Sequence, residues 1–221
     1  MPHLFPAARL IVFAKAPVPG RVKTRLRPVL GAGAARLYKR LCLSVLAVAA
    51  DSGAAPLELH AAPSRGHPWL RARARDLSAS LRVQRPGDLG RKMARALGQA
   101  LKGAPMAVII GADCGGLRAD TIRRAFEVLD SGEDMVVTPA EDGGYVLVGA
   151  RQRINPAIFS GIDWGTERVL AQTRRNARRL GIALAEIDTS WDVDRWPDVR
   201  RWHREHGRSA GGDRTQSSQS R

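Results

Sequence analysis

The sequence predicts an α/β sandwich built on a mainly parallel sheet. Short apolar runs that suit buried strands alternate along the chain with longer segments whose apolar residues recur at helical spacing. In addition, the apolar runs 9–14 and 106–110 are each followed directly by a polar, glycine-containing segment, 15–27 and 111–117. Ligands of such sheets bind beyond the carboxyl ends of the strands. We therefore expect these two segments to lie on the same edge of the sheet and to form a site.

The first half of the chain begins with a buried strand over 9–14, because this run is continuously apolar. Pro17 and Pro19 forbid regular pairing after it, and Gly20 permits a tight turn. Asp88 is a plausible N-cap for a later helix. The remaining elements expected in this half are a helix over 33–50, strands at 56–61 and 81–84, a short helix at 69–76, and the helix that runs from Asp88 to about Leu101.

The second half opens with the most convincing buried strand, 106–110. Two further strands are expected at 134–138 and 145–149, joined by a glycine-rich turn without a helix, which departs from the regular alternation. The other expected elements are helices at 120–129, 166–180 and 195–205 and a strand at 182–187. We expect residues 1–205 to form a single domain, and the Ser/Gly/Gln-rich segment 206–221 to be a disordered tail.

The composition is that of an ordinary globular protein of 221 residues, with 44% hydrophobic and 26% charged residues. No apolar run approaches the ~20 residues of a membrane span, and the first ten residues do not resemble a signal peptide. Cys42 and Cys114 lack CxxC spacing. We therefore expect no disulfide, no zinc site and a cytoplasmic location.

The net charge of +15 is unevenly distributed. Residues 1–110 carry 19 Lys and Arg against four acidic residues, whereas residues 111–221 carry 17 of each sign. A high positive charge can indicate a nucleic-acid-binding protein. The chain has only 5% aromatic residues, no RNA-recognition signature and no basic recognition helix. We therefore expect weak, sequence-independent binding of polyanions and no specific nucleic-acid partner.

The segment after the first strand is rich in basic residues and braced by proline. Convergent Lys and Arg in a stiff loop suit a diphosphate or triphosphate, although the Walker pattern is absent. The alternative is a solvated basic turn. The candidate phosphate-binding residues are Lys15, Gly20, Arg21, Lys23 and Arg25.

Asp113 follows the most apolar strand, where an isolated carboxylate is costly unless a cation neutralises it. A hard metal ion that also holds phosphate oxygens would supply that charge, and we expect the protein itself to leave the charge partly unrelieved. The alternative is a helix-capping or turn aspartate. Asp142 supports a weaker version of the same argument, since Asp-Gly is also a plain turn signal.

Asp192 and Asp194 alternate, so both point to one side of an extended segment, where they would repel each other without a cation. They are candidate metal or substrate ligands. Asp194 could instead cap the helix expected to begin at Arg195.

A series of motifs in order closely resembles the glycosyltransferase-like family called radical-SAM/selenodomain-associated transferase 1. The resemblance spans about residues 9–203 and implies the GT-A, or nucleotide-diphospho-sugar transferase, fold: a Rossmann-like three-layer sandwich. More distantly, the chain is similar to molybdenum cofactor guanylyltransferase and 2-phospho-L-lactate guanylyltransferase. The motifs are Phe-Ala-Lys-Ala-Pro-Val-Pro-Gly-Arg-Val-Lys-Thr-Arg-Leu (13–26), Gly-Asp-Leu-Gly (87–90), Gly-Ala-Asp-Cys (111–114), Pro-Ala-Glu-Asp-Gly-Gly-Tyr (139–145), Asp-Trp-Gly-Thr (163–166) and Asp-Val-Asp (192–194).

The sequence departs from these families in two places. Family members usually carry a proline soon after the Asp113 position, where this chain has Cys114-Gly115-Gly116, and we expect a looser loop there. The segment Thr24-Arg-Leu-Arg-Pro28 is similar to the T-R-L-x-P of sugar-nucleotide pyrophosphorylases, but the Gly-x-Gly that precedes it in those enzymes is missing. This absence argues against a standard sugar-1-phosphate nucleotidyltransferase.

The resemblance implies a transferase that uses a nucleotide-activated donor, Mg²⁺ or Mn²⁺, and a small acceptor. In the leading hypothesis, the first loop holds the diphosphate of an NDP-sugar, Asp113 with Asp192 or Asp194 holds the metal, and Asp142 orients the acceptor or acts as a base. The alternative is attack at the α-phosphorus, which is nucleotidyl transfer with release of pyrophosphate. The sequence does not separate the two reactions, because both place the same cations around the same phosphates.

Overall fold

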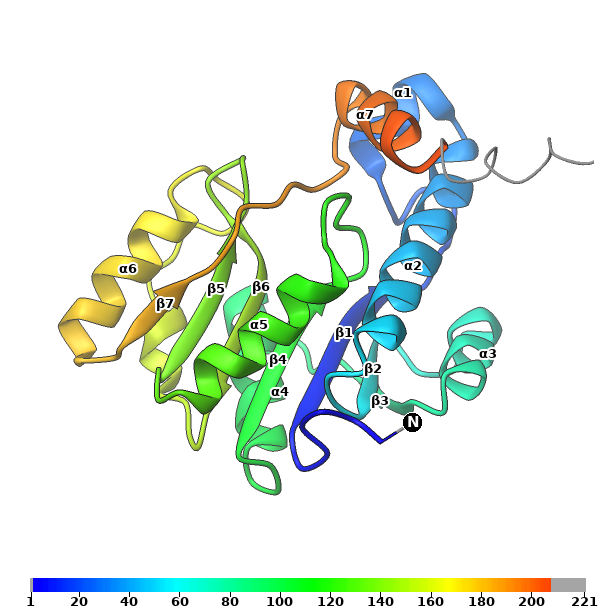
Figure 1. Ribbon diagram of the computed structural model, residues 1–221. Coiled ribbons are helices and arrows are strands. Elements are labelled where there is room, and N and C mark those ends of the chain that lie inside the picture. The colour runs from blue at the N-terminus through cyan, green and yellow to red at the C-terminus, as the bar shows by residue number, and fades with distance from the viewer. Residues whose placement is uncertain (1, 208–221) are drawn as a thin grey trace, which may run out of the picture.

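A computed structural model describes residues 2–207, so most of the expected tail, 208–221, lies outside the described residues. The strands form one sheet in the order β3-β2-β1-β4-β6-β5-β7 (Figure 1). Their bounds are β1 (Arg9–Lys15), β2 (Leu57–Ala62), β3 (Ser80–Val83), β4 (Met106–Gly111), β5 (Met135–Pro139), β6 (Tyr145–Arg151) and β7 (Leu184–Glu186).

The sheet is mainly parallel, which confirms the predicted fold class. β1 pairs in parallel with β2 and β4, β2 with β3, and β5 with β7. β6 is antiparallel to both of its neighbours, β4 and β5. The turn 141–144 returns the chain directly into β6, so no crossover helix is available to make that strand parallel.

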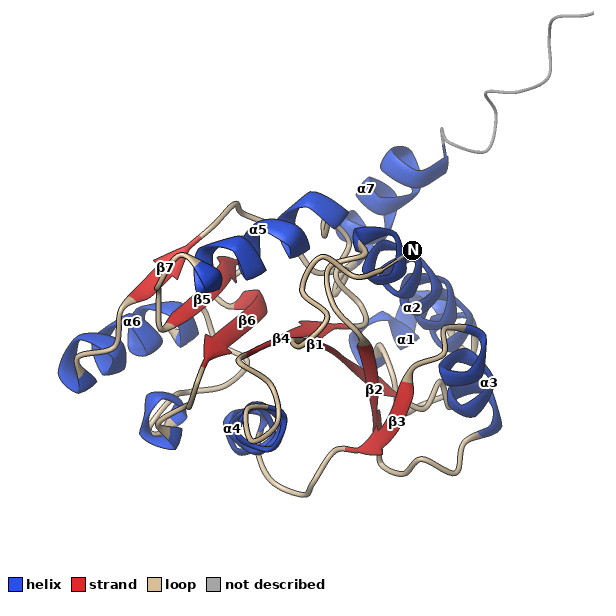
Figure 2. Cartoon of the chain, turned by 60° about the horizontal axis from the view of Figure 1, so that its bottom comes forward, coloured by secondary structure: helices blue, strands red, loops and turns tan. Residues whose placement is uncertain are grey.

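Helices cover both faces of the sheet and make three layers (Figure 2). One face packs against α2 (Gly33–Ser52), α3 (Pro68–Asp76) and α5 (Ala119–Asp130). The other packs against α4 (Leu89–Ala100), the 3₁₀ turn η2 (Pro156–Phe159) and α6 (Val169–Leu180). Beyond the carboxyl edge lie the 3₁₀ turn η1 (Thr24–Leu26), α1 (Arg27–Leu30) and α7 (Trp196–Gly207).

A third apolar cluster anchors the segments at this edge. Leu26 from the first loop packs with Trp191 and Val193 from the segment before α7 and with Trp202 of α7, against the amino-terminal half of α2. These large side chains are at most 6% exposed. The cluster therefore holds the first loop and the 190–194 segment together, although they are far apart in sequence.

The expected elements differ from the structure mainly at their ends. The helix expected from 166 begins at Val169, because the Thr166 hydroxyl donates to the Asp163 carbonyl in a turn, at 2.8 Å. The strand expected over 182–187 is limited to Leu184–Glu186. α7 extends to Gly207, so the first two residues of the expected tail are helical.

Both cysteines are free and buried. None of the helices among residues 2–207 is long and apolar enough to cross a membrane.

Candidate active site

The two polar segments predicted to share an edge do so. β1 and β4 are parallel neighbours, so the first loop and the segment after Gly111 leave the sheet side by side. An isolated bridge between Cys114 and Asp192 joins the 190–194 segment to them. The buried Tyr38 hydroxyl accepts a hydrogen bond from the Lys15 backbone N–H, at 2.8 Å, and fixes the start of the loop against α2.

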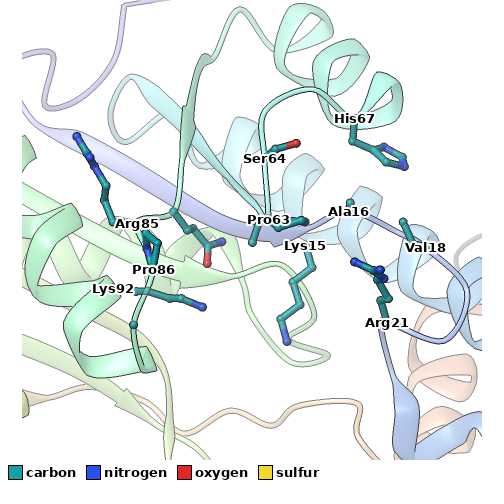
Figure 3. A pocket seen from close by; sticks show the side chains of 13 residues that line it. Lys15, Ala16, Val18, Arg21, Pro63, Ser64, His67, Arg85, Pro86 and Lys92 are labelled. Carbon is teal, nitrogen blue, oxygen red and sulfur yellow. The ribbon is translucent and has the colours of Figure 1, made fainter.

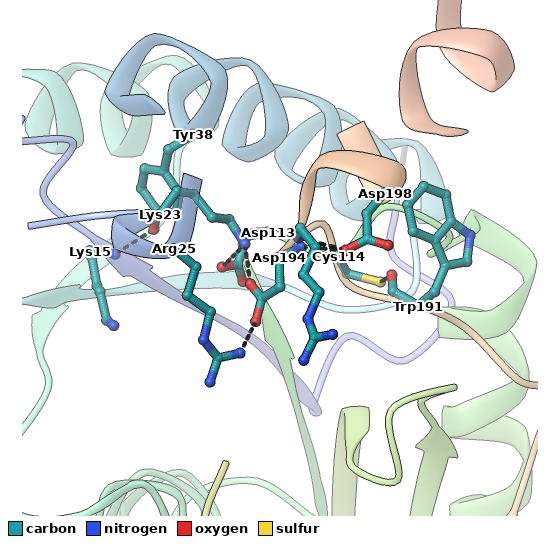
Figure 4. A network of polar contacts seen from close by, with 10 residues as sticks. Lys15, Lys23, Arg25, Tyr38, Asp113, Cys114, Trp191, Asp194 and Asp198 are labelled. Atoms are coloured by element: carbon teal, nitrogen blue, oxygen red, sulfur yellow. Dashed lines mark hydrogen bonds and ion pairs between the residues drawn. The ribbon is translucent and has the colours of Figure 1, made fainter. Parts of the chain in front are cut away.

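Lys23 occupies the centre of this site (Figure 4). Its Nζ lies 2.8 Å from Asp113 Oδ2 and 2.9 Å from Asp194 Oδ1, and its side chain is 3% exposed. Lys23 adopts a left-handed backbone conformation, with φ of 45°, which turns it inward at the start of η1. The expectation is that the protein leaves the Asp113 charge partly unrelieved; the structure places a buried ammonium against this charge and shares it with Asp194.

Asp194 is engaged by the first loop and does not cap α7. Its second carboxylate oxygen lies 3.2 Å from the Arg25 guanidinium. Asp198, in the first turn of α7, instead accepts hydrogen bonds from the backbone N–H groups of Asp194 and Arg195. Partial burial alone would raise the pKa of Asp194, but Lys23 and Arg25 stabilise its ionised form and lower the pKa.

Asp192 has the opposite electrostatic environment. Burial, followed by the nearby Asp113 carboxylate, raises its pKa to about 8, and Lys23 only partly offsets this. Asp194 and Asp142 also contribute to the rise in the pKa of Asp192. Asp113, Asp142 and Asp194 therefore all lie near enough to Asp192 to affect its pKa, and Lys23 contacts Asp113 and Asp194.

The donor chemistry of this cluster suits Mg²⁺ or Mn²⁺, since hard divalent cations take carboxylate oxygens. The pKa of Asp192 is raised first by burial and then by the neighbouring carboxylates, so a bound cation would favour its ionised form. No group of three or more His, Cys, Asp or Glu side chains within residues 2–207 is arranged to hold a metal ion. In this arrangement the Lys23 ammonium lies between Asp113 and Asp194.

The Cys114-Gly115-Gly116 segment is packed, contrary to the expected looser loop. A Cβ on Gly115 or Gly116 would lie 2.6 Å from Trp191 atoms, so only glycine permits this close approach. The Cys114 thiol lies 3.3 Å from the Ser190 hydroxyl, and burial raises its pKa to about 12. Cys114 and the two glycines therefore seat the Trp191 segment that carries Asp192 and Asp194.

A cavity of about 670 Å³ opens at the carboxyl ends of β1, β2 and β3, on the same edge of the sheet as the cluster. Lys15 and Arg21 enter it from the first loop, and Arg85 and Lys92 lie on its opposite side (Figure 3). The five basic residues of the loop thus have different environments. Lys15 and Arg21 line the cavity, Lys23 and Arg25 pair with carboxylates, and Arg27 does neither. Gly20, also a candidate, lies in the turn before Arg21 with φ of 78° and does not line the cavity.

Several cavity residues were missed by the sequence analysis. Gln84 donates through Nε2 to the carbonyl oxygens of His60 and Ala14, at 2.8 and 3.4 Å, and so joins β3 to its neighbours at the cavity floor. Their position in the sequence could have indicated them, because each follows a strand whose carboxyl end lies at this edge of the sheet or lies near the start of α4. These residues are Pro63, Ser64, His67, Gln84, Arg85 and Lys92.

Asp142 lies on the exposed turn between β5 and β6, where its carboxylate accepts from the Gly144 N–H at 3.0 Å. Gly143 in the same turn has φ of 85°, and a Cβ there would collide with the Glu167 backbone. The turn is therefore held against the 163–168 segment, and Asp142 faces the cluster closely enough to influence Asp192.

Comparison with known proteins agrees with this geometry. The model of the family described as "Uncharacterized protein conserved in bacteria (DUF2064)" matches residues 45–166, more than half of the chain. A Desulfovibrio desulfuricans G20 structure, provisionally assigned as a nucleotide-diphospho-sugar transferase, is 28% identical with a TM-score of 0.81, over 96% of this chain and 92% of that one. No curated protein matches the chain.

Two more distant structures share the fold. A nucleotidyl transferase from Methanothermobacter thermautotroptrophicus is 14% identical with a TM-score of 0.58, over 92% of this chain and 99% of that one. Glucosyl-3-phosphoglycerate synthase from Mycobacterium tuberculosis, in complex with Mn²⁺, UDP and its product, is 14% identical with a TM-score of 0.52, over 89% and 75%. The GT-A fold implied by the motif series is thereby confirmed.

Proposed function

Because the chain belongs to the DUF2064 family and has the GT-A fold, we propose that it is a metal-dependent transferase that uses a nucleotide-activated donor. The reaction that the site supports best is glycosyl transfer from an NDP-sugar to a small acceptor. Residues 1–205 are the catalytic unit in this proposal, because all seven strands belong to one sheet.

The observation that carries the proposal is the position of the cavity. Within the described residues its charged lining residues are Lys15, Arg21, Arg85 and Lys92, with no acidic residue among them. It shares the first loop with the carboxylate cluster, because Arg21 lines the cavity and Lys23 pairs with Asp113. A nucleotide placed there can present its phosphates to the first loop while its activated end reaches the cluster. Charge-assisted hydrogen bonds from Lys and Arg would hold these phosphates and stabilise the charge that develops on the leaving NDP.

The carboxylates take different roles in this scheme. Asp113, Asp192 and Asp194 would hold Mg²⁺ or Mn²⁺, which when bound supplies positive charge to the departing diphosphate. Lys23 would leave at least one of its two carboxylates as the cation binds, and its ammonium could then turn toward a phosphate. Asp142, exposed on its turn, would orient the acceptor hydroxyl or accept its proton.

Nucleotidyl transfer is the second candidate, and it uses the same residues. Attack at the α-phosphorus would release pyrophosphate, with Lys15 and Arg21 on its oxygens. Support for this reaction is the fold shared with a nucleotidyl transferase. The provisional assignment of the 28%-identical structure favours the NDP-sugar reaction instead.

Product analysis tests the proposal. The protein is incubated with Mg²⁺ or Mn²⁺ and a panel of NTPs and NDP-sugars, with water or added alcohols as acceptors. We expect metal-dependent release of NDP from an NDP-sugar. Pyrophosphate released from an NTP would select the second candidate, and turnover of no donor would contradict both.

A matched pair of variants locates the donor. Arg85→Ala should weaken nucleotide binding about tenfold, since one charge-assisted bond is worth roughly 1.5–3 kcal/mol. Arg71→Ala removes the same charge from the exposed surface of α3 and should leave binding unchanged. Equal affinities for the two variants in calorimetry would remove the cavity from the donor site.

A further inference from the structure

A second cavity, of about 1440 Å³, forms a groove between β3 and α4. Among residues 2–207 no helix covers this face of β2 and β3, whereas α4 packs on β4 (Figure 2). The alternation in β2 reflects this arrangement: Leu59 and Ala61 belong to the core under α2 and α3, while Glu58 and His60 face the groove side. Phe13 and His60, with stacked rings 5.7 Å apart between centroids, line its floor.

The groove is lined by two rows of cations. Lys92, Arg95 and Lys102 lie along one side, at spacings that place them on one face of α4 and its continuation. Arg65, Arg82 and Arg85 lie on the β3 side. No acidic residue lines the groove in the described part of the chain. Like charges that face each other across a cavity repel unless an anion lies between them.

Within the described residues, the only ion pair that a groove cation forms is that of Arg82 with Glu58. Glu58 lies 2.9 Å from Arg82, 2.9 Å from His60 and 4.0 Å from Arg9. Arg95 is tied to the Pro86 carbonyl. The remaining four cations form no ion pair with any described residue; they are Arg65, Arg85, Lys92 and Lys102.

The length of the groove indicates how long a ligand must be to contact both of its ends. The eight steps from Lys92 to Ala100, the last residue of α4, span about 12 Å at the helical rise of 1.5 Å per residue, and Lys102 lies two residues further on. A single phosphate or diphosphate cannot contact both ends. Four of the six cations are arginines, whose planar guanidinium binds phosphate in two-point fashion and also stacks on bases.

We propose that this groove binds a single-stranded nucleic acid by its phosphodiester backbone, without sequence preference. The site is separate from the carboxylate cluster and adjoins the donor cavity at Gln84–Pro86 and Lys92, which line both. The chain thus carries two anion sites, one for a nucleotide and one for an extended strand. The second does not depend on the proposed transferase activity.

Anisotropy of a labelled oligouridine of about ten nucleotides, titrated at several salt concentrations, tests the proposal. The groove variant is Arg65→Ala/Arg95→Ala/Lys102→Ala, which changes no residue of the donor cavity. The matched control, Arg175→Ala/Arg178→Ala/Arg179→Ala, removes the same charge from the exposed side of α6. Thermal melting of both variants verifies that they are folded, and inorganic tripolyphosphate serves as a compact competitor.

We expect the groove variant to lose roughly tenfold or more in affinity at low salt, and the slope of log affinity against log salt to fall by about 2, for three lost phosphate contacts at ~0.7 each. The α6 variant should bind like the wild type. Equal losses in both variants would indicate diffuse surface charge and overturn the proposal. Absence of oligouridine binding, or equal competition by tripolyphosphate per phosphate, would also overturn it. A groove variant that unfolds is replaced by Lys102→Ala alone, with an expected slope change of about 0.7.

Discussion

Removing the two carboxylates that neutralise Lys23 provides a quantitative test of the site's electrostatics. In the Asp113→Asn/Asp194→Asn variant, the Lys23 side chain would remain 3% exposed but would lose the two carboxylates that now lie 2.8 and 2.9 Å from its Nζ. Asp192 stays nearby, but burial is the main cause of its raised pKa, so it replaces them only in part. The two aspartates are themselves 39% and 43% exposed, so in the reciprocal variant, Lys23→Met, water can solvate them. The two perturbations of one network should therefore have unequal costs.

The magnitude follows from the buried lysine. An uncompensated buried charge costs about 3–5 kcal/mol when one side of a buried pair is removed. The lysine can limit this cost by losing its proton, which from an ordinary pKa of 10.5 costs at most about 5 kcal/mol at pH 7. Lys23→Met removes the buried charge together with its desolvation cost and leaves accessible carboxylates, so we expect about 1–2 kcal/mol.

Urea and thermal unfolding of the metal-free protein measure both values. We expect the double aspartate variant to melt about 10 °C below the wild type, at 2–4 °C per kcal/mol for this chain length. Its stability should rise with pH, because the unfolded chain then binds more protons than the native state. Adding Lys23→Met to the double variant should restore most of the loss. A double variant as stable as the wild type, or one that Lys23→Met does not rescue, would refute the reasoning.

Two further predictions concern the same edge of the sheet. Because the pKa of Asp192 is raised to about 8, its native state holds a proton that the unfolded state releases near pH 4, so stability should fall as pH rises from about 4 to about 8. Urea unfolding across this range should show a shallower decline in Asp192→Asn, and an unchanged slope would contradict the pKa assignment. Gly143→Ala should destabilise the protein by about 3 kcal/mol or more, because its Cβ meets the Glu167 backbone. Gly161→Ala, at φ of 63° in open space, should cost only about 1 kcal/mol. Equal melting temperatures for Gly143→Ala and Gly161→Ala would show that the turn at Gly143 can move to accommodate a side chain.

The layered fold could be predicted from the sequence because its information is local. Apolar runs and helical spacing located the strands and helices, and the absence of a helix between β5 and β6 was visible as a glycine-rich turn. Element ends were less accurate. Thr166 closes a turn through its hydroxyl, and its sequence resembles the first turn of a helix.

The partners of the site residues could not be predicted, because they depend on long-range packing. The pairing of Lys23 with Asp113 and Asp194 joins positions up to 171 residues apart. It also requires the left-handed backbone at Lys23, which no glycine or asparagine signals. Likewise, the glycine at position 115, which departs from the family pattern, allows Trp191 to pack closely against the loop, and the sequence alone does not show this contact.

Nucleotide binding with and without metal tests the central claim most directly. Calorimetric titration of nucleoside di- and triphosphates into the protein, with and without Mn²⁺, should reveal at least one nucleotide whose binding is strengthened by the metal. Asp113→Asn should abolish the strengthening, whereas Asp130→Asn, which removes an exposed carboxylate at the far end of α5, should preserve it. Binding of no nucleotide, or metal-dependent binding that survives Asp113→Asn unchanged, would contradict the account.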